Sequence, residues 1–358
     1  MSTLHDLTVA RVDRITPDAV AVAFELPEAL AERFAFAPGQ YLTLETELDG
    51  QKVRRSYSIC SGPQDPLRVG IKKVEGGRFS TFAHERLEPG RTLRVMPPMG
   101  RFVVLDEPRP LHHVAFAAGS GITPILAIAG HVLERRPDDR FTLFYGNRRM
   151  ADVMFLEELH RLKDRYMGRL VLHHFLSRES SDVPFSRGRL DGAKIRALAD
   201  ARVVEPSDLD VAYVCGPGDM IDAVTEGLLE VGVPRDRVRF ERFTPAGEPA
   251  PARVEASPAP APSGAAEVEV EVRLDGVVRS FPLTGDEGVI EAASKAGVDV
   301  PWSCHGGMCS TCRCKLVEGE ATMAVNYALE PWELERGYIL ACQARPKSAR
   351  LVLDFDDQ

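Results

Sequence analysis

Five of the seven cysteines in this chain of 358 residues lie in its last fifth. Cys304, Cys309 and Cys312 follow the pattern C-x4-C-x2-C, and a further 29 residues separate Cys312 from Cys342. This is the spacing of the ligands of a plant-type [2Fe–2S] cluster, in which four thiolates hold two irons. Two consecutive glycines in the loop would let the backbone pass close to the sulfides. The pattern therefore predicts that these four cysteines are metal ligands.

Two other uses of the cysteines are less consistent with the sequence. A structural zinc site usually shows two C-x2-C pairs or a pair with histidines, whereas this segment has one C-x2-C and only His305 nearby. A disulfide framework needs an oxidising compartment, and the N-terminus has neither the basic nor the apolar region of a secretory signal. The spare thiol, Cys314, is interpreted as a small buried residue.

Composition sets the broad class. A chain of this length predicts two or three domains, and 44% hydrophobic with 27% charged residues is typical of a soluble globular protein. No apolar run approaches the roughly 18 residues of a membrane span. The net charge of −9 argues against nucleic acid as a partner. Cysteine-rich clusters without a secretory signal favour the reducing cytoplasm.

The negative charge is concentrated near the C-terminal end. From residue 266 onward there are 16 Asp and Glu residues against 9 Lys and Arg residues, which accounts for −7 of the total. The surplus is either a solvated acidic surface or a field that steers this part of the chain toward a more basic partner. The sequence leaves both interpretations open.

Hydrophobic periodicity divides the chain into four segments. Residues 1–106 contain short alternating runs separated by turns, which predicts an antiparallel β-barrel. Residues 107–245 alternate apolar runs with helical stretches, which predicts a parallel sheet covered on both faces. Residues 246–264 are rich in Pro and Ala and predict a semi-rigid linker. Residues 265–358 combine a hairpin, a short helix and the cysteine loop, which predicts a small α+β domain.

Two motifs in the first segment can bind a phosphorylated aromatic cofactor. On an alternating strand, Arg55-Ser-Tyr57-Ser58 presents a guanidinium, a ring and a hydroxyl. Further on, Gly76-Gly77 precedes a helical stretch, and a helix start offers backbone N–H groups to an anion. Each motif alone is weak, because most such strands and turns are only structural.

Together, and upstream of an α/β segment, these motifs resemble the flavin-binding pair of the ferredoxin–NADP reductase family. The resemblance implies FAD on the β-barrel and, with the cysteine loop, a C-terminal β-grasp ferredoxin domain. The residues that it implies around the flavin are Arg55, Tyr57 and Ser58. Those that it implies near the pyrophosphate are Gly77, Phe79 and Ser80.

A nucleotide site is indicated in the second segment. Gly119-Ser-Gly121-Ile-Thr123-Pro departs from the G-x-G-x-x-G fingerprint because its last position is proline. It nevertheless follows a predicted strand and begins a helix, the context that places a pyrophosphate at a helix N-terminus. This segment resembles the nicotinamide-nucleotide site of the reductase family. In that family a second glycine-containing segment lies near the nicotinamide. The residues so implied are Gly119, Gly121, Thr123, Cys215, Gly216 and Pro217.

Four side chains of this segment carry further expectations. Arg148 and Arg149 follow the second α/β strand, where an arginine favours the 2′-phosphate of NADPH and an acidic residue favours NADH. Phe243 is a candidate for covering the flavin, as an aromatic does in relatives, or else an ordinary core residue. Cys215 is either near the nicotinamide or an ordinary residue at a strand end. Ser58, Cys215 and Phe243 are thus the candidate catalytic residues.

Three redox groups in one chain imply an order of electron transfer. A nicotinamide gives two electrons as a hydride, a [2Fe–2S] cluster passes one at a time, and a flavin can accept a pair and release single electrons. The expected path therefore runs from NADPH through FAD and the cluster to an external acceptor. On this interpretation the protein is an oxidoreductase whose residues position cofactors.

Over essentially its whole length, the domain order resembles the reductase components of multicomponent oxygenases. Within that group, residues 4–12, 75–80 and 326–344 resemble the reductase subunits of phenylacetyl-CoA epoxidases of phenylacetate catabolism. That likeness implies a di-iron oxygenase as partner, although the Pro/Ala linker is longer than expected there. The alternatives are the reductase of a Rieske-type aromatic or steroid hydroxylase and, from another class, a non-catalytic flavin and iron–sulfur sensor.

Overall fold

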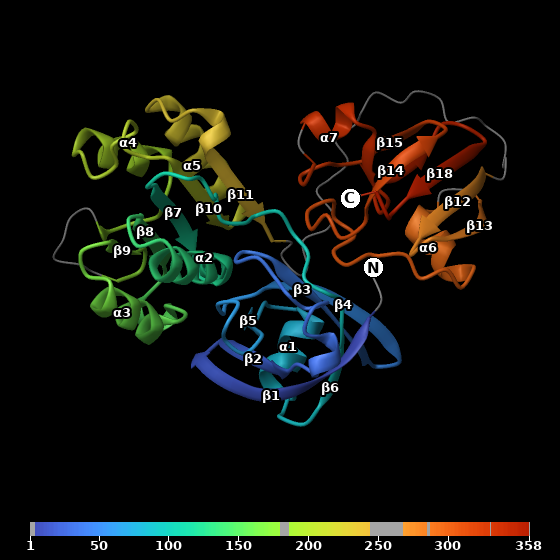
Figure 1. The fold of residues 1–358 in the computed structure, drawn as a ribbon, viewed down its shortest axis with the longest axis horizontal. Helices are drawn as coiled ribbons and strands as arrows, with labels where there is room; N and C mark the ends of the chain where they lie inside the picture. Colours follow the sequence, from blue (N-terminus) through green and yellow to red (C-terminus); the bar gives the residue numbers. More distant parts are fainter. Residues whose placement is uncertain (1–3, 180–185, 244–267, 285–286, 330, 358) are drawn as a thin grey trace. The chain divides into compact units, whose positions relative to one another are not determined.

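The computed structural model describes residues 4–179, 186–243, 268–284, 287–329 and 331–357 (Figure 1). Residue contacts group these into two compact units, each described below by itself. One comprises Asp6–Leu42 and Tyr57–Phe243, and the other combines Thr43–Ser56 with the described C-terminal residues. The predicted linker at 246–264 lies outside the described residues. No helix in the described part of the chain is long and apolar enough to cross a bilayer.

The N-terminal sheet has six strands in the order β4-β3-β6-β1-β2-β5. Adjacent strands such as β1 and β2, and β2 and β5, are antiparallel, as the turn spacing predicts. Its elements are β1 (His5–Thr16), β2 (Ala19–Glu25), β3 (Tyr41–Leu48), β4 (Gln51–Ser58), β5 (Arg68–Lys72), α1 (Arg78–Glu85) and β6 (Thr92–Val95), with a 3-10 turn at Glu28–Leu30.

Strand β2 differs from a half-exposed strand. Its alternating Val20, Val22 and Phe24 are buried as expected, but so are the alanines between them. Ala19 and Ala21 belong to a core cluster that also contains residues of α2 (Ile122–Arg135). The two faces of β2 are therefore both covered, and small side chains allow a close approach on one of them.

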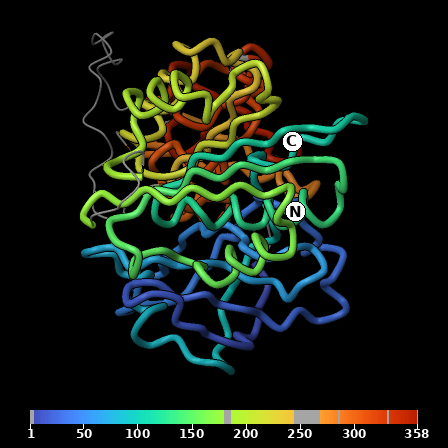
Figure 2. Tube along the Cα trace, turned by 90° about the vertical axis from the view of Figure 1, so that its left-hand side faces the viewer, coloured from blue at the N-terminus to red at the C-terminus, as the bar shows by residue number. Residues whose placement is uncertain are grey.

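The unit that comprises Asp6–Leu42 and Tyr57–Phe243 also contains a parallel sheet with helices. Its strand order is β11-β10-β7-β8-β9. Figure 2 follows this sheet as the teal-to-yellow part of the trace. Its strands are β7 (His112–Ala118), β8 (Arg140–Asn147), β9 (Leu170–Leu176), β10 (Val211–Gly216) and β11 (Val238–Arg242). Its other helices are α3 (Leu156–Arg165), α4 (Gly192–Asp200) and α5 (Gly218–Glu230). Short 3-10 turns lie at Gly119–Gly121, Met150–Asp152 and Arg235–Arg237.

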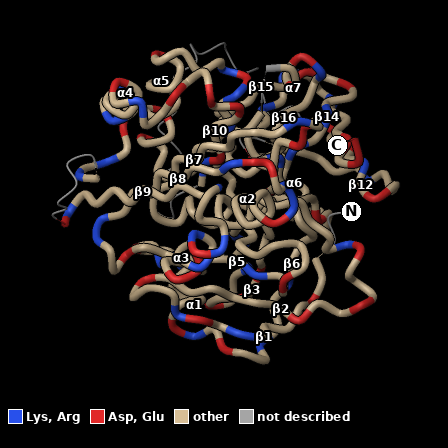
Figure 3. Tube along the Cα trace, turned by 60° about the vertical axis from the view of Figure 1, so that its left-hand side comes forward, with Lys and Arg blue, Asp and Glu red and all other residues tan. Residues whose placement is uncertain are grey.

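Alternate residues of the central strands face opposite sides of this sheet. Ala115 and Ala117 pack in one cluster with α2 and α3, whereas Val114 and Phe116 pack in another with α4 and α5. Strands β7 and β10 carry no Lys, Arg, Asp or Glu, in keeping with burial on both faces (Figure 3). The predicted parallel sheet with helices on both faces is confirmed.

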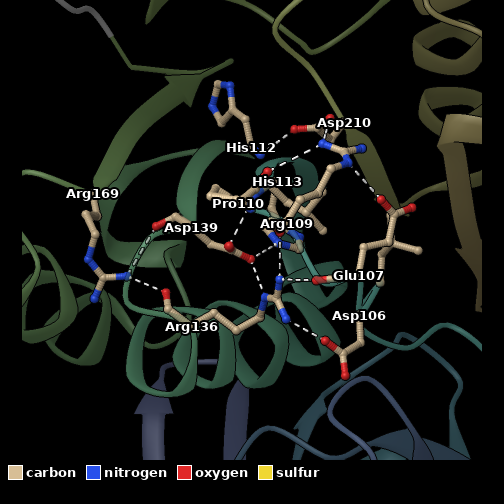
Figure 4. A network of polar contacts seen from close by, with 12 residues as sticks. Asp106, Glu107, Arg109, Pro110, His112, His113, Arg136, Asp139, Arg169 and Asp210 are labelled. Carbon is tan, nitrogen blue, oxygen red and sulfur yellow. Dashed lines mark hydrogen bonds and ion pairs between the residues drawn. The ribbon is translucent and has the colours of Figure 1, made fainter.

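A buried polar network lies at the amino ends of these strands (Figure 4). Asp139 accepts hydrogen bonds from Leu111 N at 3.1 Å and from Arg136, and contacts His113 Nε2 at 2.9 Å. Arg136 also donates to the carbonyls of Glu107 and Arg109, at 2.7 and 3.0 Å. Burial lowers the pKa of His113, opposed by Asp139. The network fastens the segment that leads from the N-terminal sheet into β7.

The C-terminal sheet has five strands in the order β13-β12-β18-β14-β16, with β12 and β18 parallel and the other pairings whose register is resolved antiparallel. Asp275 and Gly276 both have positive φ in the β12–β13 hairpin, as the Asp-Gly signal predicts. The elements are β12 (Val268–Leu274), β13 (Val277–Leu283), α6 (Val289–Lys295), β14 (Arg313–Glu318), β15 (Ala321–Met323), α7 (Pro331–Glu335), β16 (Tyr338–Leu340), β17 (Ala344–Pro346) and β18 (Arg350–Asp354).

Candidate functional site

The four predicted cluster ligands lie as two pairs of neighbouring thiols. Cys304 and Cys309 are hydrogen-bonded to each other, and so are Cys312 and Cys342. Within the described residues, no three His, Cys, Asp or Glu side chains converge on a single metal ion. Two pairs of neighbouring thiols suit a group with two irons that each take two thiolates. The thiols therefore fit a [2Fe–2S] cluster.

The backbone of the cysteine loop favours negative charge on the sulfur of Cys304. Gly306 N lies 3.3 Å from Cys304 Sγ. Hydrogen bonds from Cys309 and from neighbouring backbone N–H groups lower the pKa of Cys304, against the opposing effect of burial. Gly307 has φ of +74°, and a Cβ there would lie 3.1 Å from a neighbouring carbonyl oxygen. The loop thus has the tight, donor-rich backbone that thiolate and sulfide ligands need.

Cys314 stands apart from the ligands. It is fully buried on β14, and its Sγ lies 3.9 Å from the carbonyl oxygen of Ile339. Burial raises the pKa of this thiol above its usual range. The expectation that Cys314 is a small buried residue agrees with this position.

In the same unit, strand β4 contacts the residues that lead into the cysteine loop. Ser56 Oγ donates to Ser303 Oγ at 2.9 Å, one residue before the first ligand. Arg54 Nη2 donates to the two carboxylate oxygens of Asp299, at 2.9 and 3.2 Å. Its guanidinium lies over the ring of Trp302, 4.6 Å from the centroid. Two residues of β4 in this unit therefore contact the segment that leads into the cysteine loop.

The two flavin motifs meet at a pair of aromatic rings. Tyr57 on β4 is half-buried, and its ring centroid lies 5.5 Å from that of the buried Phe79 on α1. Ser80 is buried as well, and its Oγ donates to Gly77 O at 3.2 Å and accepts from Val74 N at 3.1 Å. Ser80 thus supports the turn with its side chain, and the start of α1 offers backbone N–H groups to an anion.

Arg55 lies on β4 two residues before Tyr57 and is half-buried. Its Nη1 donates to the carbonyl oxygen of Arg54 at 2.7 Å. This leaves the guanidinium on the same strand as the other predicted flavin residues. A guanidinium, an aromatic ring, a hydroxyl and helix-start N–H groups are chemical groups that suit a flavin nucleotide.

The two predicted nucleotide segments are packed against each other. A Cβ on Gly121 would lie 2.1 Å from the carbonyl oxygen of Cys215 and 2.8 Å from Gly216 N, so only glycine permits the approach. Gly119 has φ of +54°, and its carbonyl oxygen accepts from the Tyr145 hydroxyl at 2.9 Å. Pro217 directly precedes α5. The turn into α2 and the turn into α5 thus form one cradle of backbone N–H groups.

The Thr123 hydroxyl makes a hydrogen bond within its own turn, and its predicted contact with the nucleotide stays a prediction. The residue is buried, and its Oγ1 donates to the carbonyl oxygen of Ser120 at 2.9 Å. The side chain therefore closes the turn from within. Its methyl group points toward β5, where it meets the space above Gly70.

A half-buried acid that the sequence analysis does not single out joins Ser58 to Cys215. Ser58 Oγ donates to Glu241 Oε2 at 3.3 Å, and Glu241 is directly paired with Cys215 across β10 and β11. Burial raises the pKa of Glu241 to about 8, opposed by the Ser58 hydrogen bond. Burial, reinforced by Glu241, also raises the pKa of Cys215. At neutral pH both groups therefore keep their protons.

The candidate 2′-phosphate side chains lie at the carboxyl ends of β8 and β9. Arg148 and Arg149 are exposed, and the carbonyl oxygen of Arg148 accepts from Arg178 N at 2.8 Å. Glu179 accepts a hydrogen bond from Met150 N at 2.8 Å. Strand pairing therefore adds Arg178 and an acidic residue to the two predicted arginines. Neither addition could be found without knowing that β9 lies next to β8.

Phe243 follows β11 and is half-buried. It packs against the core cluster on the α2 and α3 side of the parallel sheet. Its position is therefore compatible with the ordinary core residue that is the alternative to a flavin cover. A role at the flavin stays a prediction.

Comparison with known families assigns three segments of the chain to known domain families. Residues 6–104 match an oxidoreductase FAD-binding domain, residues 116–226 an oxidoreductase NAD-binding domain, and residues 272–347 a 2Fe-2S iron–sulfur cluster binding domain. The phthalate dioxygenase reductase structure covers 98% of this chain and 98% of its own, with a TM-score of 0.60 and 24% identity, which shows a shared fold. Fold and sites together define a flavin- and nicotinamide-dependent iron–sulfur oxidoreductase.

Two curated relatives match nearly end to end. One subunit of the 1,2-phenylacetyl-CoA epoxidase of Escherichia coli is 42% identical over 99% of this chain and 99% of its own. The ferredoxin reductase component of 3-ketosteroid-9-alpha-monooxygenase from Rhodococcus rhodochrous is 36% identical over 98% of this chain and 96% of its own. The chain belongs to the family of FAD-, NAD- and [2Fe–2S]-binding reductase components of multicomponent oxygenases.

Proposed function

We propose that this chain transfers electrons from NADPH to an oxygenase component that epoxidises phenylacetyl-CoA, by way of FAD and a [2Fe–2S] cluster. The observation that carries the proposal is the 42% identity with a subunit of such an epoxidase over the whole chain. The acceptor in this proposal is a di-iron oxygenase, and the thioester would bind there. A cytoplasmic location goes with this proposal, because none of the seven cysteines is in a disulfide and the cluster needs reduced thiols.

When bound, the three groups supply a hydride donor, a carrier that accepts two electrons and releases them singly, and a one-electron carrier. The chain's own residues hold and orient these groups. Backbone N–H groups at the starts of α1, α2 and α5 would bind pyrophosphate oxygens. Tyr57 and Ser58 would face the flavin, and the four thiolates would hold the irons. Ser56 and Arg54 support the segment before Cys304, which they contact.

Glu241 acts in this proposal as a proton-holding group beside the flavin. With its pKa raised to about 8, the carboxyl is protonated at neutral pH and exchanges a hydrogen bond with Ser58 Oγ. A neutral carboxyl avoids placing a fixed negative charge where reduction of the flavin adds electrons. Cys215, also kept neutral by burial, fills the floor of the nicotinamide position.

The preference for NADPH rests on the arginines after β8 and β9. Arg148 and Arg178 are joined through a backbone hydrogen bond, which brings two cations to the place where the adenosine ribose is held. Guanidinium groups bind a phosphate through charge-assisted hydrogen bonds. Glu179 is an acidic residue at the same strand ends, and an acidic residue there would favour NADH. Its carboxylate accepts a hydrogen bond from Met150 N and is therefore part of the loop structure.

One titration tests the cofactors and the nucleotide preference together. The purified protein is reduced anaerobically with NADPH or NADH while its visible spectrum is recorded. We expect the flavin and cluster bands to bleach in sequence at lower concentrations of NADPH than of NADH. A protein that binds both groups but is not reduced by either nucleotide would instead be a sensor.

The identity with a 3-ketosteroid monooxygenase reductase gives a second candidate function. Purified oxygenase components separate the two. We expect this chain to support NADPH-dependent oxidation of phenylacetyl-CoA by the epoxidase oxygenase and not oxidation of a 3-ketosteroid by its monooxygenase. The reverse result would favour the steroid system.

A further inference from the structure

Strand β5 of the flavin-binding sheet lies directly against the turn that begins the nucleotide site. Gly70 of β5 is buried, and a Cβ at this position would lie 2.5 Å from Thr123 Cγ2 and 3.1 Å from the ring of Phe155. The first distance is far below any normal carbon–carbon contact. Only glycine therefore lets the two parts of this unit approach so closely.

The approach has support on the neighbouring strand. Gly70 is paired with Ala21 of β2, and Ala19 and Ala21 pack in the same core cluster as the buried residues of α2. These small residues allow the backbone of β2 and β5 to pack closely against α2, as in other close-packed contacts. The contact is continuous with the sheet that carries Tyr57 and Ser58.

Thr123 connects this contact to the nucleotide cradle. Its methyl group rests above Gly70, while its Oγ1 holds the carbonyl oxygen of Ser120 at 2.9 Å. Ser120 stands between the two glycines of the turn, and Gly121 is packed on Cys215. A displacement of Thr123 would therefore move the whole cradle relative to the flavin sheet.

A second set of contacts lies on the same side of Gly70 as Thr123. Phe155 has φ of +59°, unusual for a bulky residue, which directs its backbone into α3 while its ring stays over Gly70. Arg68, two residues before Gly70, makes a bidentate ion pair with Glu158 of α3 at 3.0 and 2.6 Å. The same guanidinium lies 5.4 Å from the Phe155 ring centroid. These contacts fix α3 against β5.

We infer that Gly70 is a positioning residue for hydride transfer, because its missing side chain sets the separation between flavin and nicotinamide. The step that it serves moves one hydride, two electrons with a proton, from the nicotinamide, which is oxidised, to the flavin, which is reduced. Such a transfer requires the reacting atoms to be about 3–3.5 Å apart. The inference deepens the proposed function and rests on its electron path.

The test replaces Gly70 with alanine. In anaerobic stopped-flow mixing with saturating NADPH, we expect G70A to lower the limiting rate constant of flavin reduction by about 10- to 100-fold. The dissociation constant of NADP⁺, measured from the flavin difference spectrum, should stay close to that of the wild type, because the cradle moves as one piece. Flavin content and melting temperature report whether the variant is folded.

A matched control and a rescue variant make the test specific. Gly130 lies on the same helix α2 as Thr123, and a Cβ there meets nothing within 4 Å, so G130A should reduce flavin at the wild-type rate. T123S removes the methyl group that collides with the new Cβ but keeps the hydroxyl. We expect G70A/T123S to recover the rate constant of T123S alone to within about threefold.

The outcomes separate the inference from the proposed function. If NADPH does not reduce the flavin of the wild type, the electron path itself is wrong. If the wild type is reduced and folded G70A is equally fast, Gly70 has no positioning role. A loss of NADP⁺ affinity as large as the loss of rate, or a failure of T123S to restore the rate, would show that Gly70 only shapes the loop and would also overturn the inference.

Discussion

The cluster loop and the flavin–nucleotide site are built in opposite ways. Three of the four cluster ligands come from nine consecutive residues, and the loop backbone supplies donors to its own sulfurs. The flavin–nucleotide site combines turns after β7 and β10 with an acid on β11 and a glycine on β5. The first is therefore sensitive to single ligating atoms, and the second to the volume and charge of residues that bind no cofactor.

The largest expected effect is the loss of one cluster ligand. Cys309→Ala should abolish the cluster absorbance and EPR signal and reduce cytochrome c reduction to background, because one iron loses a thiolate. Flavin reduction by NADPH should persist, since the other site is built separately. Cys314→Ala is the matched control and should keep the cluster. Loss of the cluster in C314A but not in C309A would overturn the ligand assignment.

The next effect concerns the nucleotide. Arg148→Ala should lower kcat/KM for NADPH about 10- to 100-fold, the value of one or two charge-assisted hydrogen bonds to phosphate. The value for NADH should change by less than about twofold, because NADH has no 2′-phosphate. Steady-state kinetics with both nucleotides measure this. Equal losses for the two would show that Arg148 does not recognise the phosphate.

A smaller effect is expected from pH. The pKa of Glu241 is raised to about 8, so the carboxyl is protonated below that pH and ionised above it. The limiting rate of flavin reduction should therefore fall severalfold as pH rises through about 8. Glu241→Gln, which cannot ionise, should lose this limb of the profile. An unchanged profile in E241Q would assign the titration to another group.

The smallest effect belongs to the Arg68–Glu158 pair, whose side chains are 16% and 27% exposed. A double-mutant cycle with R68A and E158A should give a coupling of about 0.5–1.5 kcal/mol in the free energy of unfolding. Urea unfolding followed by flavin fluorescence measures it. A coupling of zero would remove this pair from the contacts that hold α3 on β5.

What can be predicted from the sequence follows the same division. The four cysteines and the glycine turns are local patterns, and the domain classes follow from periodicity, so these expectations describe the fold well. Glu241 carries no local signal, because its importance depends on lying beside Cys215 through the β10–β11 pairing. Arg178 depends likewise on the β8–β9 pairing. No sequence pattern marks Gly70, because its role comes from what lies above it.

The structure gives two predicted cofactor-binding residues a second role. Ser80 and Thr123 are buried and their hydroxyls bond to backbone of their own turns, while their contact with a cofactor stays a prediction. A hydroxyl at a helix start can serve a ligand or the turn, and the local sequence is the same for both. Strand β2 likewise alternates in sequence but is buried on both faces, because its alanines face α2.

The polar network around Asp139 has a consequence for exchanging modules between reductases (Figure 4). Leu105 N donates to the Tyr213 hydroxyl at 2.8 Å, and Arg239 Nη1 to the carbonyl oxygen of Val103 at 3.0 Å. The connecting segment is thus hydrogen-bonded to the nucleotide-binding half. A chimera joined within residues 103–111 would separate buried charged groups from their hydrogen-bond partners. A chimera joined before residue 103 would keep these groups and their partners together.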